Sequence, residues 1–94
     1  MNVKVLRINT GEEVITSIVE DNEDTLVVKD PIVAYNSGEG QIGFGPWAPL
    51  VKNGEDITVD KKYIVYISEA QDEVVGQYKK MFSTIETPSK KLIL

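Results

Sequence analysis

The chain has 94 residues, of which 41% are hydrophobic and 27% are charged, and its formal net charge is −5. This composition is typical of one soluble globular domain with a modest core. The absence of cysteine and histidine excludes disulfides and thiolate metal sites, and it removes the commonest catalytic base. We therefore expect a protein that is not an enzyme and holds no cofactor or metal. The negative charge argues against broad, charge-driven binding to phosphates, although a local basic patch is compatible with it.

The chain has no apolar run approaching the roughly 20 residues of a membrane-spanning helix. Charged residues interrupt its start at Lys4 and Arg7, so we expect no signal peptide. The expected location is the cytoplasm, without membrane contact.

Runs of β-branched and aromatic residues alternate with turn residues along most of the chain, which predicts antiparallel strands without crossover helices. We expect strands at residues 3–9, 14–20, 26–35, 57–59 and 63–67. The third strand should break or bulge near Pro31, because proline has no N–H for a regular ladder. Residues 41–51 are apolar but carry two prolines, which predicts a strand with an irregular second half. The predicted fold class is all-β, a five-stranded, strongly bent antiparallel small barrel.

The end of the chain has a different pattern, which predicts one added C-terminal α-helix at residues 69–85 and a tail at 86–94. Ser68 and Gln71 have the spacing of a capping box. Apolar residues on one helical face are expected to pack on the barrel: Val74, Tyr78, Met81 and Phe82. The chain 1–94 is then a single domain with its barrel at about residues 3–67.

Two stretches of the chain carry a shared family spacing. The first has Gly11, Val14, Ile18, Asp21 and the strand 26–30, and the second has Val59 and the strand 64–67. This arrangement resembles the two-part signature of the Sm-like (Sm, Lsm and Hfq) superfamily, and it is similar to short acidic Sm-like proteins of marine cyanobacterial phages. The resemblance implies a homo-oligomeric ring of about five to seven subunits, closed by strand addition between copies.

The same resemblance implies binding or remodelling of single-stranded RNA without catalysis. A contact to RNA is expected at Lys61, Lys62 and Tyr63, where two cations beside an aromatic ring suit a phosphate and a stacked base. Thr25 and Asp21 would line the family's pocket. Thr25, however, replaces the base-binding asparagine, and Asp60 and Lys61 replace an arginine–glycine pair. A solvated hairpin turn is the alternative reading of the two lysines.

The expected ring interface is the last strand of the barrel, which is apolar and carries no proline: Tyr63, Ile64, Val65, Tyr66 and Ile67. The rival function is a ring scaffold that has lost RNA binding and mediates protein–protein interaction. Its partner surface would be Phe44 and Trp47, or the C-terminal helix and tail. Alternatively, Trp47 covers an end of the barrel or lies under the helix.

Two further motifs have plain structural readings. Residues 38–43 match G-x-G-x-x-G, but the following Pro46 and Trp47 cannot begin the helix that a dinucleotide site needs, so a hairpin loop is expected. The acidic run 20–24 lacks the glycine and distal glutamate of a calcium loop. We expect it to be a solvated turn.

Overall fold

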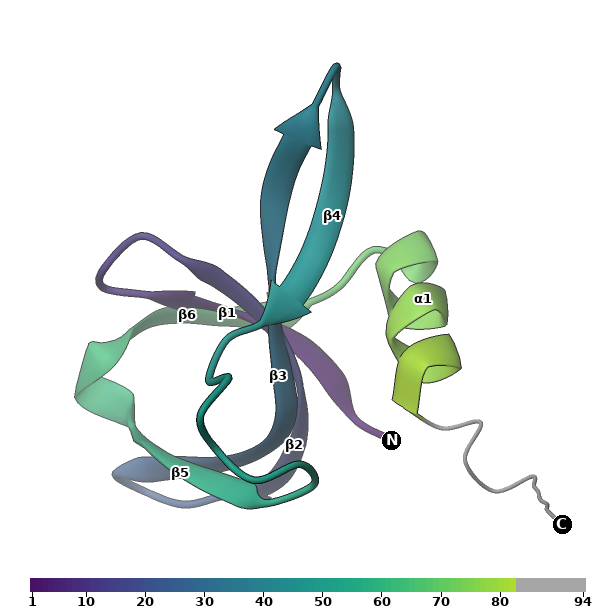
Figure 1. The fold of residues 1–94 in the computed structure, drawn as a ribbon. Helices are drawn as coiled ribbons and strands as arrows, with labels where there is room; N and C mark the ends of the chain where they lie inside the picture. Colours follow the sequence, from purple (N-terminus) through teal and green to yellow (C-terminus); the bar gives the residue numbers. More distant parts are fainter. Residues whose placement is uncertain (83–94) are drawn as a thin grey trace, which may run out of the picture.

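The fold is one antiparallel sheet with a helix packed on its outer face (Figure 1). The computed structural model describes residues 1–82. Its elements are β1 (Val3–Ile8), β2 (Glu13–Asp21), β3 (Thr25–Gly38), β4 (Gln41–Pro46), β5 (Asp56–Asp60), the 3₁₀ turn η1 (Lys61–Tyr63), β6 (Ile64–Glu69) and α1 (Asp72–Phe82). The mainly β, antiparallel character and the C-terminal helix are confirmed.

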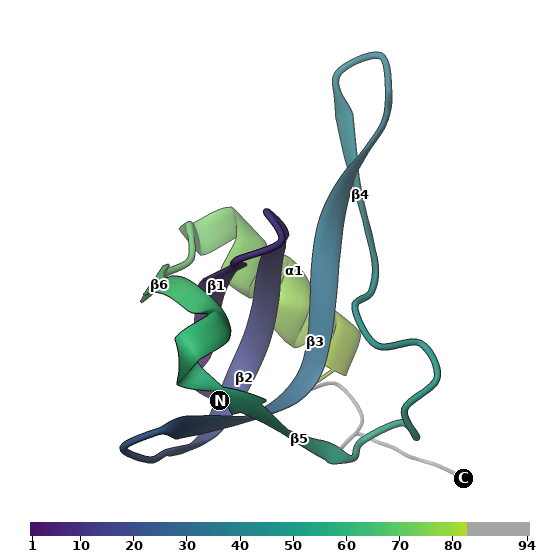
Figure 2. The same ribbon diagram turned by 90° about the vertical axis from the view of Figure 1, so that its left-hand side faces the viewer.

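The long strand β3 organises the sheet. The strand order is β4-β3-β2-β1-β6, and β5 also pairs with β3. The first part of β3 pairs with β5, and its last part pairs with β4 in a hairpin that projects from the body (Figures 1 and 2). The sheet is curved but not closed, because none of the pairings in residues 1–82 joins β5 to β6.

The structure has six strands where a five-stranded barrel was predicted. The strand expected at residues 41–51 is confirmed, with a regular first half at 41–46 and an irregular second half at 47–51. Pro46 is accommodated at the end of β4, where the missing N–H is tolerated. The predicted bulge near Pro31 is confirmed: opposite β2 the register shifts, so that Ile15 faces Ile32 while Ser17 faces Lys29. Tyr63 belongs to η1 rather than to the last strand.

Two hydrophobic clusters occupy the two faces of the sheet, since consecutive residues of a strand point to opposite sides. The inner cluster consists of Leu6, Ile8, Val14, Leu26, Val28 and Val59. The outer cluster consists of Val3, Ile15, Ile32 and Tyr78, with Val5, Phe44, Val74, Val75 and Phe82 packed against it. Helix α1 therefore buries the apolar outer face of β1 and β2, as Figure 2 shows.

The helix differs from its prediction at its start and in its packing face. Ser68 lies in β6, where its hydroxyl lies 3.4 Å from the Glu69 carbonyl oxygen, so it forms no capping box. The N–H of Val75 bonds to the carbonyl of Gln71 at the start of the helix. Met81 is 47% exposed, and Val75 packs in its place. Residues 83–85 of the predicted helix and the tail lie outside the described residues.

Tyr78 joins the helix to the bulge of β3. Its hydroxyl oxygen lies 2.8 Å from the carbonyl oxygen of Lys29 and 2.9 Å from that of Asp30. Asp30 has a φ of 52°, a left-handed conformation that costs free energy for a residue other than glycine. Burial, followed by the Asp30 carboxylate, raises the pKa of the Tyr78 hydroxyl well above its ordinary value.

We predict that Tyr78→Phe lowers the free energy of unfolding by about 1 kcal/mol, because the part-buried carbonyl of Asp30 loses the Tyr78 donor and that of Lys29 keeps only the hydroxyl of Thr16 as a side-chain donor. Urea denaturation measures this loss. The exposed hydroxyl of Tyr35 provides the control, since Tyr35→Phe should change stability by less than about 0.5 kcal/mol.

Comparison of the wild type with Tyr78→Phe also tests the raised pKa of Tyr78. In the unfolded chain the Tyr78 hydroxyl ionises at about pH 10, whereas in the folded protein it keeps its proton to higher pH. Its contribution is complete below the unfolded pKa and is lost as pH rises above it, by up to about 1.4 kcal/mol per pH unit. Tyr78→Phe should remove this part of the alkaline loss of stability. An unchanged alkaline slope would contradict the assignment.

Candidate functional site

The turn η1 is held rigidly between β5 and β6. Asp60 caps it, because its Oδ1 accepts a hydrogen bond of 3.0 Å from the N–H of Lys62. The N–H of Lys61 donates to the carbonyl of Asp24 at 2.9 Å. At the end of the turn, the carbonyl of Tyr63 accepts from the N–H of Asn9 at 2.8 Å. The turn is thus fixed to the β2–β3 turn and to the end of β1.

This anchoring brings the predicted RNA-contact residues to one end of the molecule. Thr25 begins β3 directly opposite Asp60 of β5. Its carbonyl and hydroxyl accept hydrogen bonds from Asn22, at 2.9 and 3.2 Å. The ammonium group of Lys61 lies 2.5 Å from a carboxylate oxygen of Asp21. The β2–β3 turn, with Asp21 and Thr25, is thus joined to the distant residues Asp60 and Lys61.

The electrostatics of this end are less favourable for a phosphate than its lysines suggest. Lys61 is paired with Asp21, and the Nζ of Lys62 lies 3.8 Å from Asp60 Oδ2. The same Nζ lies 5.3 Å from the ring centroid of Tyr63, in cation–π range. Glu20 near the end of β2 and Glu23 and Asp24 in the β2–β3 turn are exposed as well. The local field is accordingly negative, and an incoming phosphate would meet more carboxylates than free cations.

Strand β6 is the second notable feature, because five of its six residues are exposed. Val65 is 64% exposed, and Tyr66 and Ile67 are also on the surface. Tyr66 is fixed, since its hydroxyl donates to Glu13 at 2.5 Å and the guanidinium of Arg7 lies 5.9 Å from its ring centroid. An ordered strand thus presents apolar side chains to solvent on both of its faces.

Phe44 and Trp47 do not lie together as one patch. Phe44 packs against the outer cluster below α1, and Trp47 packs against the inner cluster. The indole N–H of Trp47 donates to Glu12 Oε1 at 3.2 Å. Both rings are partly buried.

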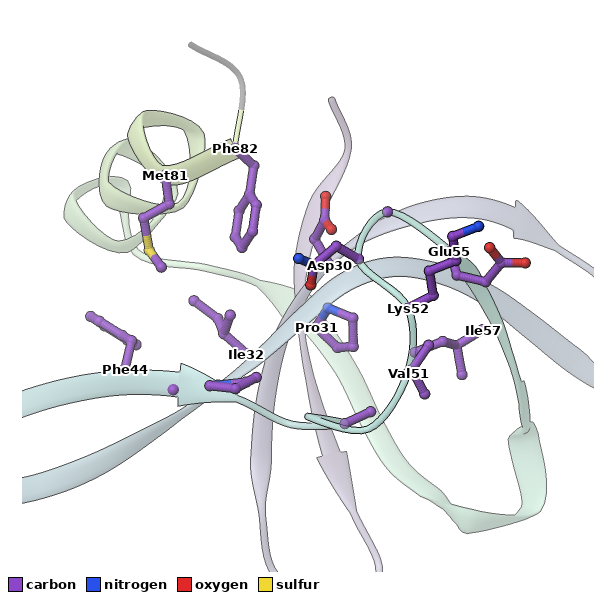
Figure 3. A pocket seen from close by; sticks show the side chains of 15 residues that line it. Asp30, Pro31, Ile32, Phe44, Val51, Lys52, Glu55, Ile57, Met81 and Phe82 are labelled. Carbon is purple, nitrogen blue, oxygen red and sulfur yellow. The ribbon is translucent and has the colours of Figure 1, made fainter. Parts of the chain in front are cut away.

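Two apolar depressions flank the outer cluster, and sequence patterns gave no signal for either. A pocket of about 250 Å³ lies between the bulge of β3 and the end of α1, with Pro31, Ile32, Phe44 and Phe82 among its walls (Figure 3). An open groove of about 720 Å³ lies between the β3–β4 hairpin, the end of β6 and the start of α1. Both are assembled from segments distant in sequence, which is why patterns of neighbouring residues do not reveal them.

Residues 1–82 contain neither a metal-binding group of side chains nor a membrane-spanning helix. Among residues 1–82, no group of three or more acidic side chains is arranged to hold a metal ion. Within the same residues, no helix has the length and apolar character needed to cross a bilayer. No protein-family model matches the sequence, and comparison with curated proteins finds no relative.

We predict that the cap at Asp60, rather than the ion pairs, stabilises this end. Asp60→Ala should lower the free energy of unfolding by about 0.5–2 kcal/mol, because the N–H of Lys62 loses its acceptor. Asp60→Asn keeps an acceptor and should cost distinctly less. Lys61→Ala should cost less than about 1 kcal/mol, since its ion pair is exposed. Urea denaturation of the three variants checks this order, and equal losses would contradict it.

Proposed function

We propose that this protein is a non-catalytic, Sm-like subunit that forms a homo-oligomeric ring, and that the ring works as a scaffold for protein–protein interaction. The single observation behind this proposal is β6, an apolar strand that pairs with β1 on one side and is largely exposed. An unprotected, apolar edge strand is a template for pairing with another chain. A monomer gains nothing from keeping Val65 and Ile67 in water.

Strand β5 supplies the complementary edge. It pairs with β3 along one side, and the described pairings leave its other side open. Addition of β5 of one copy to β6 of the next uses two different surfaces, so the contact is head-to-tail. Such a contact closes into a ring when the rotation between copies permits it, and the Sm-like resemblance gives about five to seven copies. The same pairing would continue the curved sheet of one copy into that of the next.

We predict that Val65→Lys converts the oligomer to a monomer, because a lysine on the strand opposes edge-to-edge pairing. Multi-angle light scattering at micromolar concentration measures the mass. Circular dichroism should be unchanged, since Val65 is mostly exposed.

Val19→Lys is the matched control, because Val19 is an exposed valine on β2, a strand paired on both sides. It adds the same charge and should leave the assembly intact. A wild-type protein that stays monomeric at all concentrations tested would refute the ring.

Single-stranded RNA binding is the second candidate function. The convergence of Lys61, Lys62 and Tyr63 with Thr25 and Asp21 favours it, and Tyr63 is 47% exposed and available for stacking on a base. In a ring, one such turn from each copy would multiply weak contacts. The surrounding carboxylates weigh against it, and for that reason we place the scaffold first.

Fluorescence anisotropy with uridine-rich and adenine-rich oligonucleotides separates the two candidates. If RNA binds, affinity should fall with salt, and replacing Lys61 and Lys62 together by alanine should flatten the salt slope. Tyr63→Ala should weaken binding by about 1–3 kcal/mol per stacked base at every salt concentration. Absence of binding at tens of micromolar protein in low salt would leave the scaffold as the function.

A further inference from the structure

The groove beside β6 is apolar and only partly covered by the chain's own helix. Ile42 on its hairpin wall is 62% exposed, and Ile67 on the β6 wall is exposed as well. Val74 lines the groove where α1 begins. The helix starts at Asp72, and it covers the outer face at Val3, Ile15 and Ile32. It leaves Ile42 of the hairpin exposed.

One large apolar side chain outside this groove, that of Leu50, is almost fully exposed to water. Leu50 is 98% exposed, at a tight turn in which the N–H of Val51 donates to the carbonyl of Ala48 at 3.1 Å. Val51 beside it is also exposed. The turn belongs to the segment that leads directly into β5. A hydrogen-bonded turn thus holds the Leu50 side chain in solvent, where it has no apolar partner within the described residues.

The direction of the strands relates the Leu50 turn to the groove. Every pairing in the sheet is antiparallel. If β5 of one copy adds to β6 of the next in the same sense, the start of β5, Asp56, lies beside the end of β6, Glu69. The turn that precedes β5 then reaches the residues after β6. Ala70, Gln71 and Val74 follow β6 and form one end of the groove.

We propose that Leu50 of one copy inserts into the groove formed by Ile42, Ile67 and Val74 of the next copy. The occupant is thus a second copy of this chain, and the inference rests on the proposed ring. The contact adds side-chain burial to the backbone hydrogen bonds of strand addition. It also favours one register, because a shift along β6 would withdraw the leucine from the groove.

The first test is the effect of Leu50→Asp on assembly. Because Leu50 packs against nothing in the monomer, this variant should fold normally. Burial of a leucine is strong enough that its loss should raise the concentration at which the assembly dissociates by at least about tenfold. Asn53→Asp adds the same charge to the same segment and should have little effect. Analytical ultracentrifugation over a dilution series measures both.

The second test places the leucine in the groove directly. The natural chain has no cysteine, so introduced thiols are the only ones present. Leu50→Cys protein mixed with Ile42→Cys protein and treated with a short bismaleimide should give a covalent dimer. Neither variant alone should give it, because the contact joins unlike surfaces. Leu50→Cys mixed with Val19→Cys is the matched control and should not cross-link.

The outcomes distinguish the two proposals. A wild type that is monomeric overturns both the ring and this contact. An assembly that Val65→Lys dissociates but Leu50→Asp leaves intact, with no cross-link to Ile42→Cys, overturns the contact and leaves the ring. Weakened assembly in Leu50→Asp together with the specific cross-link supports it.

Discussion

The bulge at Asp30 and Pro31, closed by the hydroxyl of Tyr78, is the constraint on which the rest of the fold depends. β3 changes partner from β5 to β4 across this bulge, where Asp30 has a left-handed conformation. The hydroxyl of Tyr78 lies within hydrogen-bond distance of the carbonyl groups of Lys29 and Asp30, and the hydroxyl of Thr16 also donates to that of Lys29. Without the Tyr78 hydroxyl, the carbonyl of Asp30 would lose this donor and that of Lys29 would keep the hydroxyl of Thr16, so the strained conformation would lose part of its compensation. Because the donor comes from α1, docking of the helix and bending of the strand stabilise each other.

The position of this junction explains why the molecule has one covered face and several open surfaces. The helix is tied to the middle of β3, so it covers the outer face of β1 and β2 and stops short of the hairpin and of β6. The hairpin therefore stands clear of the body, and one apolar groove separates it from the end of the sheet. A two-stranded hairpin has little stability alone, and contact with another chain would stabilise it. Four exposed apolar side chains, those of Ile42, Val65, Tyr66 and Ile67, thus lie on or near the free edge strand β6.

Sequence patterns predicted what depends on neighbouring residues and missed what depends on strand partners. The strands, the helix and the bulge at Pro31 follow from alternation, helical spacing and a missing N–H, which are local properties. The capping box at Ser68 failed because β6 continues through Ser68 and Glu69, which pair with Val5 and Lys4 of β1 and end in a Lys4–Glu69 ion pair. The ion-pair partner of Lys61 was equally unpredictable from sequence. Asp21 lies next to Lys61 only because β3 pairs with both β2 and β5.

Charge gives ring assembly and RNA binding opposite responses to salt. The Lys61–Asp21 pair is exposed, so it contributes little to stability, yet it cancels the field of the cation best placed for a phosphate. Each copy carries a formal charge of −5, and a ring brings several such copies together. Assembly must then overcome mutual repulsion through strand pairing and apolar contact, and salt strengthens it by screening that repulsion. RNA binding through lysines weakens with salt, because it depends on released counterions. Salt should therefore strengthen assembly under either candidate function, and only the oligonucleotide measurement, in which affinity falls with salt, tests the RNA candidate.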